Sequence, residues 1–320
     1  MDARIERLDV SAYTVPTDGP ESDGTLEWDS TTLVLVELHA GGRSGLGFTY
    51  ADSSLVKLIR EKLEKIVVDS DALALPQTWQ EMLCKTRNLG RPGLVSMAIA
   101  AVDVALWDLK ARLLELPLLK LLGQVRRGIP AYGSGGFTSY TPERLKAQMS
   151  EWAQAGLTAV KMKIGREPAK DPTRVQAARQ AIGPGPELFV DANGAYTPNQ
   201  AQAQALRFAE QGVTWFEEPV TSDALEDLHH LRGHLPAGMR VAAGEYGYDN
   251  HYFRQMLEGR AVDVLQADAT RCAGITGFLQ ASVLCDAFLV PLSAHTAPSI
   301  HQHACCAASR ACNVEYFYDH

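Results

Sequence analysis

From Ala131 onward, short apolar runs alternate with longer amphipathic stretches. One strand, one helix and two loops need the 20 to 28 residues that separate the run ends from Lys163 on. Eight such units predict parallel strands that close into an α/β barrel. A doubly wound open sheet is the alternative, but no GxGxxG follows a strand. The runs end near Ser134, Lys163, Asp191, Glu217, Glu245, Asp268, His295 and Glu315.

The first part of the chain has a different pattern. Apolar and polar residues alternate over 5–13, 32–37 is β-branched and apolar, and two glycines at 41–42 provide a turn into 44–50, which predicts antiparallel strands. Helical periodicity follows near 54–67, 77–87 and 94–114. Because Pro117, Gly123 and Gly128-Ile129-Pro130 interrupt the pattern, we expect an α+β domain over 1–126 and a barrel domain over 127–320.

Composition narrows the class of protein. The 320 residues are 46% hydrophobic and 21% charged, which is ordinary for a globular protein, and a net charge of −8 without long runs of one sign argues against nucleic-acid binding. The most apolar stretch, 94–107, contains Asp103 and reads as a buried helix rather than a membrane span. A charged N-terminus without a signal peptide and six cysteines without a CxxC pair predict a cytoplasmic protein with reduced thiols.

Three carboxylates end consecutive predicted strands. In a barrel, side chains at the carboxyl ends of the strands converge on one face. Asp191, Glu217 and Glu245 would repel one another there without a cation, and ligation by oxygen alone favours Mg²⁺ or Mn²⁺. Glu218 follows Glu217, so strand alternation directs its side chain away from the centre.

Two lysines share one predicted strand. In the segment from Val160 to Ile164, Lys161 and Lys163 lie on one face and the apolar residues lie on the other. The apolar face packs on helices, so both ammonium groups point into the barrel. Their repulsion is expected to lower the pKa of at least one, which suits a general base. The alternative is a solvent-facing edge strand with two exposed lysines.

An acid and an imidazole end the next two strands. Asp268 beside His295 would fix the tautomer of the ring and raise its basicity, which places an acid/base group opposite the lysines. Glu315 ends the last strand and is expected to hydrogen-bond a substrate oxygen. His301 and His303 resemble an HxH metal pair, but they follow Pro298 in a predicted helix and are expected at the surface. The histidines at 229, 230 and 234 are also expected at the surface.

The combined pattern resembles the mandelate racemase subgroup of the enolase superfamily. The resemblance covers nearly the whole chain and implies a modified (β/α)7β barrel, with the α+β segment as the family's capping domain. The residues that carry it are Val160-Lys161-Met162-Lys163-Ile164-Gly165, Val190-Asp191-Ala192-Asn193-Gly194, Phe216-Glu217-Glu218-Pro219, Gly244-Glu245, Asp268 with Gly274-Ile275-Thr276-Gly277, and Ser293-Ala294-His295.

The resemblance implies a role for each residue. Asp191, Glu217 and Glu245 would bind Mg²⁺. The residues implied in proton transfer are Lys163 as one base with Lys161 tuning it, His295 oriented by Asp268 as the opposite acid/base, and Glu315 as a hydrogen-bond donor to the enediolate. Asn193 and Ser134 match positions that contact substrate, and Arg271 matches a position that is often basic.

The implied reaction is removal of the proton α to a carboxylate, most simply in the dehydration of an acid sugar to a 2-keto-3-deoxy acid. The polar, acidic segment from Thr17 to Trp28 resembles a mobile loop that closes over a polyhydroxylated substrate. A 2-hydroxy-acid racemase or epimerase, and a non-catalytic binding or assembly protein with the same fold, are the alternatives. Family resemblance implies a homo-oligomer that acts on a small-molecule carboxylate.

Two sequence features bear on these alternatives. No lysine follows Lys170, so the chain lacks the sixth-strand lysine of the lactonising and dipeptide-epimerising relatives. Glu245 as third ligand suits the racemase subgroup better than the glucarate dehydratases, which have Asn there.

The sequence ends at His320, soon after the last predicted strand, whereas relatives continue and complete the capping domain. We therefore expect a naturally short or truncated chain in which closure over the substrate is affected.

Overall fold

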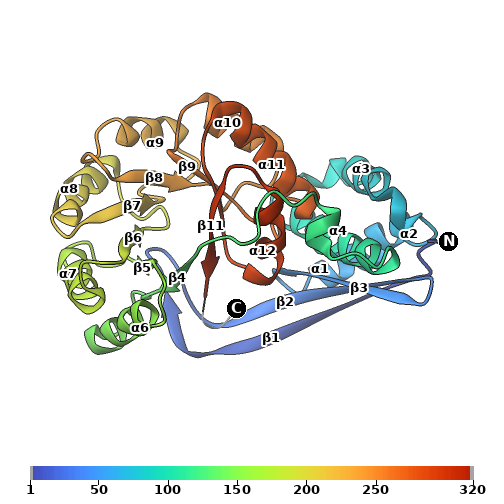
Figure 1. The fold of residues 1–320 in the computed structure, drawn as a ribbon, viewed down its shortest axis with the longest axis horizontal. Helices are drawn as coiled ribbons and strands as arrows, with labels where there is room; N and C mark the ends of the chain where they lie inside the picture. Colours follow the sequence, from blue (N-terminus) through green and yellow to red (C-terminus); the bar gives the residue numbers. More distant parts are fainter. Residues whose placement is uncertain (1–2, 318–320) are drawn as a thin grey trace.

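A computed structural model describes residues 3–317 of the chain. The N-terminal part is an antiparallel sheet of three strands in the order β1-β2-β3, with helices packed on one face (Figure 1). The strands are β1 (Arg7–Ser22), β2 (Glu27–Ala40) and β3 (Arg43–Tyr50). The helices are α1 (Leu55–Leu58), a π-turn (Ile59–Leu63), α2 (Glu64–Val67), a 3₁₀ turn (Ala72–Ala74), α3 (Leu75–Lys85), a 3₁₀ turn (Arg87–Leu89), α4 (Leu94–Leu113) and α5 (Leu118–Leu121).

The remaining strands close into a parallel barrel of eight, in the order β10-β11-β4-β5-β6-β7-β8-β9. A modified α/β TIM barrel with an N-terminal antiparallel domain was the expected fold class, and it is confirmed. The barrel strands are β4 (Ala131–Gly135), β5 (Ala159–Lys163), β6 (Glu187–Asp191), β7 (Val213–Glu217), β8 (Arg240–Ala243), β9 (Val264–Ala267), β10 (Leu292–Ala294) and β11 (Ala311–Tyr316). The helices between them are α6 (Pro142–Gln154), α7 (Asp171–Ile182), α8 (Pro198–Ala209), α9 (Leu225–Arg232), α10 (Asn250–Glu258), α11 (Gly274–Phe288) and α12 (Pro298–Ala307).

Two hydrophobic cores hold the molecule together. One lies between the barrel strands and their outer helices, and the other lies between the N-terminal sheet and α1–α4. A small aromatic layer fills the inside of the barrel, where the rings of Phe189 and Trp215 stack with centroids 4.8 Å apart. This layer seals the barrel interior below the polar residues at the strand ends.

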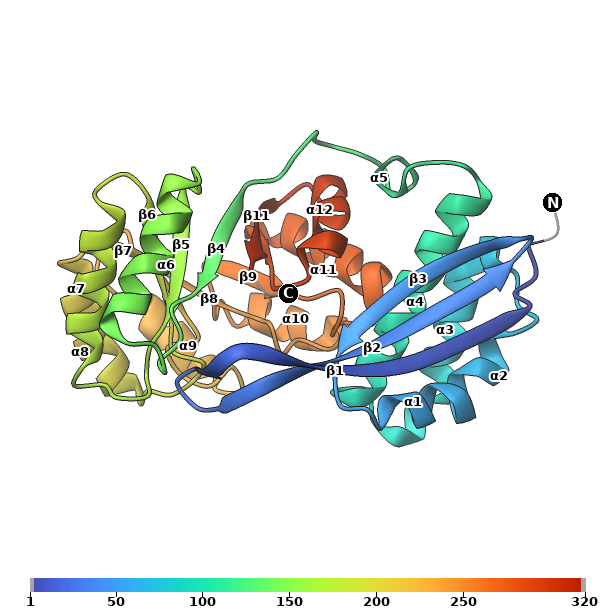
Figure 2. The ribbon, with the colours of Figure 1, turned by 90° about the horizontal axis from the view of Figure 1, so that it is seen from below.

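The β1–β2 hairpin differs from its prediction. The segment from Thr17 to Trp28, expected to be a mobile loop, lies largely in strands, because β1 continues to Ser22 and β2 begins at Glu27. Both views show this long hairpin running from the N-terminal domain to the barrel (Figures 1 and 2). Gly24 at its tip meets the barrel so closely that an added Cβ would lie 2.3 Å from the carbonyl oxygen of Ala192.

The two domains are also joined away from the hairpin. Asp103 in α4 is fully buried and accepts hydrogen bonds at the start of α11, from the Thr276 amide at 2.9 Å and the Thr276 hydroxyl at 2.6 Å. The carboxyl therefore satisfies helix-end amide groups across the interface. Burial raises the pKa of Asp103 to about 7, although these hydrogen bonds oppose the rise. Within residues 3–317, no helix combines the length and apolar character needed to cross a membrane.

Candidate active site

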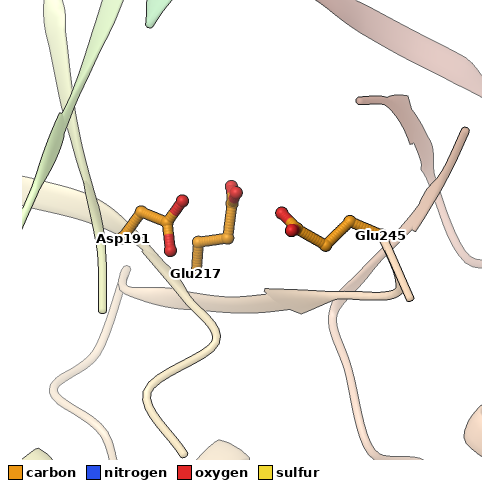
Figure 3. A group of neighbouring side chains, drawn as sticks. All are labelled: Asp191, Glu217 and Glu245. Atoms are coloured by element: carbon orange, nitrogen blue, oxygen red, sulfur yellow. The ribbon is translucent and has the colours of Figure 1, made fainter. Parts of the chain in front are cut away.

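Three carboxylates converge at the top of the barrel. Asp191 and Glu217 are the last residues of β6 and β7, and Glu245 follows β8. Each offers an oxygen within 4.8 Å of the others, all three residues are buried, and their side chains point toward one another (Figure 3). Buried carboxylates at this distance repel, and burial together with Asp191 raises the pKa of Glu217. An all-oxygen donor set of this size and charge fits a hard divalent cation.

Lys161 and Lys163 point into the barrel from β5, as expected from the alternation of the strand. Lys163 Nζ lies 2.5 Å from Asp191 Oδ2. Lys161 Nζ lies 2.7 Å from Glu315 Oε1 and also contacts Glu217. Both ammonium groups therefore contact carboxylates of other barrel strands, on β6, β7 and β11.

The expected direction of the lysine pKa shift is wrong. Burial is the largest single effect and lowers the pKa of Lys163, but the Asp191, Glu245 and Glu217 carboxylates together outweigh burial and hold that pKa above its ordinary value. The pKa of Lys161 is raised in the same way, by Glu217 and Glu315 against the effect of burial. The prediction considered only the repulsion between two ammonium groups, whereas each has a carboxylate much nearer.

The imidazole and its carboxylate lie across the barrel from the lysines. Asp268 follows β9, the strand opposite β5 in the closed ring, and His295 follows β10. His295 Nδ1 lies 2.9 Å from Asp268 Oδ2, and Nε2 lies 3.3 Å from Glu245 Oε2. Burial raises the pKa of Asp268, but the hydrogen bond from His295 and the positive charges around it, Arg271 among them, together outweigh burial and lower that pKa below its ordinary range. An ionised Asp268 leaves Nε2 facing the carboxylate group as the reactive nitrogen.

Glu315 is buried in β11 between Lys161 and the backbone amide of Thr296, which donates to its Oε2 at 3.0 Å. Burial alone would raise the pKa of Glu315, but Lys161, His295 and Lys163 together outweigh burial and lower that pKa to about 2. In this state Glu315 accepts hydrogen bonds and does not donate them. Its expected role as a donor therefore requires a proton that the surrounding charges disfavour.

A cavity of about 420 Å³ lies between the barrel and the hairpin. The residues that line it include Lys163, Asn193, Glu245, Asp268, Arg271 and His295. Ser134 does not line it; this residue is buried in β4, in register with Lys161. Leu26 and Trp28, from the segment expected to close over the substrate, line the cavity, whereas sequence reasoning missed the other hairpin and loop residues that complete it: Thr31, Tyr50, Asp52, Phe137, Tyr246 and Phe317.

One histidine was wrongly placed at the surface. His301 is fully buried in α12, while His303 two residues later is partly exposed. Desolvation by burial lowers the pKa of His301, which keeps the ring neutral. The apolar periodicity of this short helix gave no indication that a polar residue faces the barrel.

Comparison with known proteins places this architecture in a family. Residues 144–320 match the enolase C-terminal domain-like model, and residues 14–123 match the mandelate racemase/muconate lactonizing enzyme N-terminal domain. The chain belongs to the mandelate racemase/muconate lactonizing enzyme family of the enolase superfamily.

Individual relatives give the range of activities. A 3,6-anhydro-α-L-galactonate cycloisomerase of Streptomyces coelicolor is 29% identical, over 94% of this chain and 84% of its own length. The crystal structure of a mandelate racemase/muconate lactonizing enzyme-like protein from Rubrobacter xylanophilus is 54% identical, with a TM-score of 0.97, and covers 99% of this chain and 88% of its own.

Two similar structures hold ligands. L-talarate dehydratase from Polaromonas sp. JS666, complexed with Mg and L-glucarate, is 30% identical with a TM-score of 0.89, over 99% of this chain and 87% of its own. A Bradyrhizobium enolase complexed with magnesium and mandelic acid is 28% identical with a TM-score of 0.89, over 99% of this chain and 88% of its own. The homologues of this chain thus include magnesium-dependent dehydratases, cycloisomerases and racemases.

Proposed function

We propose that this protein is a magnesium-dependent enzyme that removes the α-proton of a carboxylate substrate, and that its main reaction is the dehydration of an acid sugar. One observation carries the proposal: Lys163 and His295 enter one cavity from opposite sides of the barrel, with the three carboxylates between them. This arrangement can act on both faces of a carbon atom held above the carboxylates.

Asp191, Glu217 and Glu245 would hold the cation, Mg²⁺ by preference and Mn²⁺ as a substitute with the same ligands. When bound, the cation balances the three carboxylates and, as a Lewis acid, stabilises the negative charge that develops on the substrate carboxylate. Lys161 and Glu315 form a buried ion pair beneath this position, so they support its charge without entering the cavity.

The chain's own residues would divide the proton transfers between them. With the charge of Asp191 balanced by the cation, Lys163 in its neutral form would take the α-proton from one face, as a general base worth roughly 10²–10⁴-fold in rate. His295 in its doubly protonated form, with Nδ1–H held by Asp268, would give its Nε2 proton from the other face to the departing β-hydroxyl, which leaves as water. Asn193 and Arg271 line the cavity and would contact the substrate, although Arg271 also lies 3.4 Å from Glu245 Oε1.

The far end of the cavity supports a hydroxylated substrate. The hairpin contributes three residues with hydroxyl groups, Ser30, Thr31 and Thr32, to the lining of the cavity. Asp52 adds a carboxylate at the same end. These groups can bind the hydroxyls of an acid sugar.

An aromatic wall supports the racemase as second candidate. Trp28 packs edge-on against Phe137, with ring centroids 5.6 Å apart, and Phe137 stacks on Phe317 at 6.3 Å. All three line the cavity, so the hairpin is less polar toward the site than its sequence implied. An apolar wall of this kind would bind the aryl group of a 2-hydroxy acid. Reprotonation of the α-carbon by His295 would then invert its configuration.

The test uses the protein with Mg²⁺ and a panel of acid sugars together with both enantiomers of mandelate in D₂O. We expect deuterium at the α-carbon, lost in Lys163→Ala, and a 2-keto acid that semicarbazide detects, lost in both Lys163→Ala and His295→Asn. Exchange with inversion and without keto acid would favour the racemase. Metal binding without exchange into any acid would favour a non-catalytic binding protein and contradict the proposal.

Family membership and an exposed apolar surface support assembly into a homo-oligomer. Val283 and Leu289, on and just after α11, are each 70% exposed, and such residues commonly lie in contacts between subunits. Light scattering coupled to size exclusion would give the mass of the particle, and a monomer at micromolar concentration would contradict this part of the proposal.

A further inference from the structure

A buried imidazole lies just outside the cavity. His301 Nδ1 lies 2.7 Å from the carbonyl oxygen of Thr296, and Nε2 lies 2.9 Å from the backbone nitrogen of Ala269. A carbonyl can only accept and a backbone N–H can only donate. The ring therefore carries its proton on Nδ1 and accepts at Nε2, so both nitrogen atoms are used and the imidazole is neutral.

The two backbone groups belong to neighbours of the acid/base pair. Ala269 follows Asp268, and Thr296 follows His295. His301 thus connects the chain just beyond β9 with the chain just beyond β10, while its Nε2 remains 4.0 Å from the nearer carboxylate oxygen of Asp268. It touches neither the His295 ring nor the cavity.

The backbone at this point needs support. Thr296 and Ala297 have φ values of +49° and +39°, in the left-handed region that is unfavourable for residues other than glycine. Such a conformation persists when surrounding contacts determine it. The hydrogen bond from His301 to the Thr296 carbonyl is one of these contacts, and the amide of Thr296 is fixed by Glu315.

We propose that His301 is a positioning residue that sets the register between Asp268 and His295, and so controls proton transfer on the His295 face of the substrate. The inference rests on the proposed function of the same site. It assigns to His301 no contact with substrate or metal: the residue acts through the two backbone segments that present the acid and the imidazole.

Two substitutions separate hydrogen bonding from packing. His301→Phe fills a similar volume and removes both hydrogen bonds. His301→Gln keeps one acceptor and one donor, at a spacing close to that of the two ring nitrogens. His303→Gln, in the same helix and partly exposed, is the matched control.

The first readout requires no substrate. In protein labelled with ¹⁵N-histidine and loaded with Mg²⁺, the Nδ1–H proton of His295 is identified by its loss in His295→Asn. We expect His301→Phe to shift or broaden this resonance, His301→Gln to restore it in part, and His303→Gln to leave it unchanged. An unchanged resonance in His301→Phe would overturn the proposal.

The second readout separates the two faces of the substrate. Each enantiomer of arabinonate and of mandelate is incubated in D₂O with Mg²⁺, and exchange dependent on Lys163 is compared with exchange dependent on His295. Loss of a hydrogen bond that orients a functional group typically lowers activity roughly 10–100-fold. In His301→Phe, we expect the exchange dependent on His295 to fall by this factor. The exchange dependent on Lys163 should change less than about threefold.

Equal losses on both faces, with a lower melting temperature, would make His301 a packing residue and would also overturn the proposal. Failure of the wild-type protein to exchange either acid would count against the proposed substrates and not against His301, because the resonance of His295 is measured independently.

Discussion

The acid/base pair is the part of the site in which single atoms matter most. Asp268 receives a hydrogen bond from His295 Nδ1 and two more from Thr270, whose backbone amide and hydroxyl both lie 2.7 Å from Oδ1. A carboxylate at this position holds the imidazole proton on Nδ1 and leaves Nε2 free for substrate. The orientation of His295 therefore depends on the charge of one buried residue.

Replacing that charge tests the tautomer. Asp268→Asn keeps the shape but can present an N–H to Nδ1, which would move the proton to Nε2. We expect kcat to fall roughly 10²–10⁴-fold, the range assigned to a positioned acid or base, with little change in Mg²⁺ affinity. Steady-state kinetics and calorimetric titration of Mg²⁺ measure the two quantities. Asp286→Asn, at a surface ion pair with Arg310, is the control, and an unaffected kcat in Asp268→Asn would contradict the assignment.

The sequence predicted which residues form the site wherever the geometry of a strand fixes the direction of its side chains. The metal-binding carboxylates and the two lysines were predicted because every strand end in a barrel faces the same side. The signs of the lysine pKa shifts were not, because they depend on distances between strands, such as 2.5 Å from Lys163 to Asp191. His301 escaped prediction for the same reason, since its partners belong to two other elements.

At the scale of elements, the β1–β2 hairpin is the main addition that the structure makes. Its strands were predicted, and the segment between them was expected to close the site as a mobile loop, but not predicted was that the strands themselves continue to the barrel and line the cavity. Period-two alternation gives the faces of a strand and does not say where an extended hairpin ends in space. The aromatic wall of the site, which combines Trp28 with Phe137 and Phe317, was therefore not predictable from local pattern.

Substitutions at two glycines test whether activity depends on the close contact between the hairpin tip and the barrel. In Gly24→Ala the new methyl group would meet the carbonyl oxygens of Ala192 at 2.3 Å and Ile164 at 2.8 Å, so the tip must move away from the barrel. We expect kcat/KM to fall about 10- to 100-fold, because small displacements of positioning elements are costly. Gly19→Ala, in the same hairpin with no atom within 4 Å, should behave as wild type in the same assay. Equal activity of the two variants would contradict this function of the tip.

The contact between α4 and α11 predicts a pH dependence of stability. The pKa of Asp103 is about 7 in the folded protein and 3.8 when unperturbed, so between these values the folded state holds a proton that the unfolded state has lost. The free energy of unfolding therefore falls as pH rises through this window. Asp103→Asn cannot lose a proton and should lack this decline, by a difference on the order of a few kcal/mol at pH 7. Urea unfolding of both proteins from pH 4 to 8 measures the difference, and parallel curves would contradict it.

At the scale of the whole molecule, the proposed metal site joins strands that are distant in sequence. The three carboxylates come from the ends of β6, β7 and β8, and they contact lysines from β5 and an imidazole that follows β10. A ligand that binds only the folded state stabilises it by mass action. Occupancy of this one position should therefore influence the stability of the entire barrel.

This coupling can be measured by scanning calorimetry. At Mg²⁺ concentrations about a hundredfold above its Kd, the folded state should gain about 2.7 kcal/mol, with a corresponding rise in Tm that EDTA reverses. Glu245→Gln should lose most of the gain, whereas Glu226→Gln, an exposed residue of α9, should keep it. A Tm independent of Mg²⁺ in the wild-type protein would contradict a metal site at the three carboxylates.

The residues around the site are divided between the two hydrophobic cores, and this division affects how new substrate selectivities could arise. The groups proposed to move protons are anchored in the barrel, while much of the surface around the distal part of a bound molecule belongs to a hairpin built on the other core. Codon randomisation confined to 26, 28 and 30–32 would therefore sample altered substrate preferences while leaving the reactive groups in place. A gene library of that design should contain a high fraction of folded, metal-binding members.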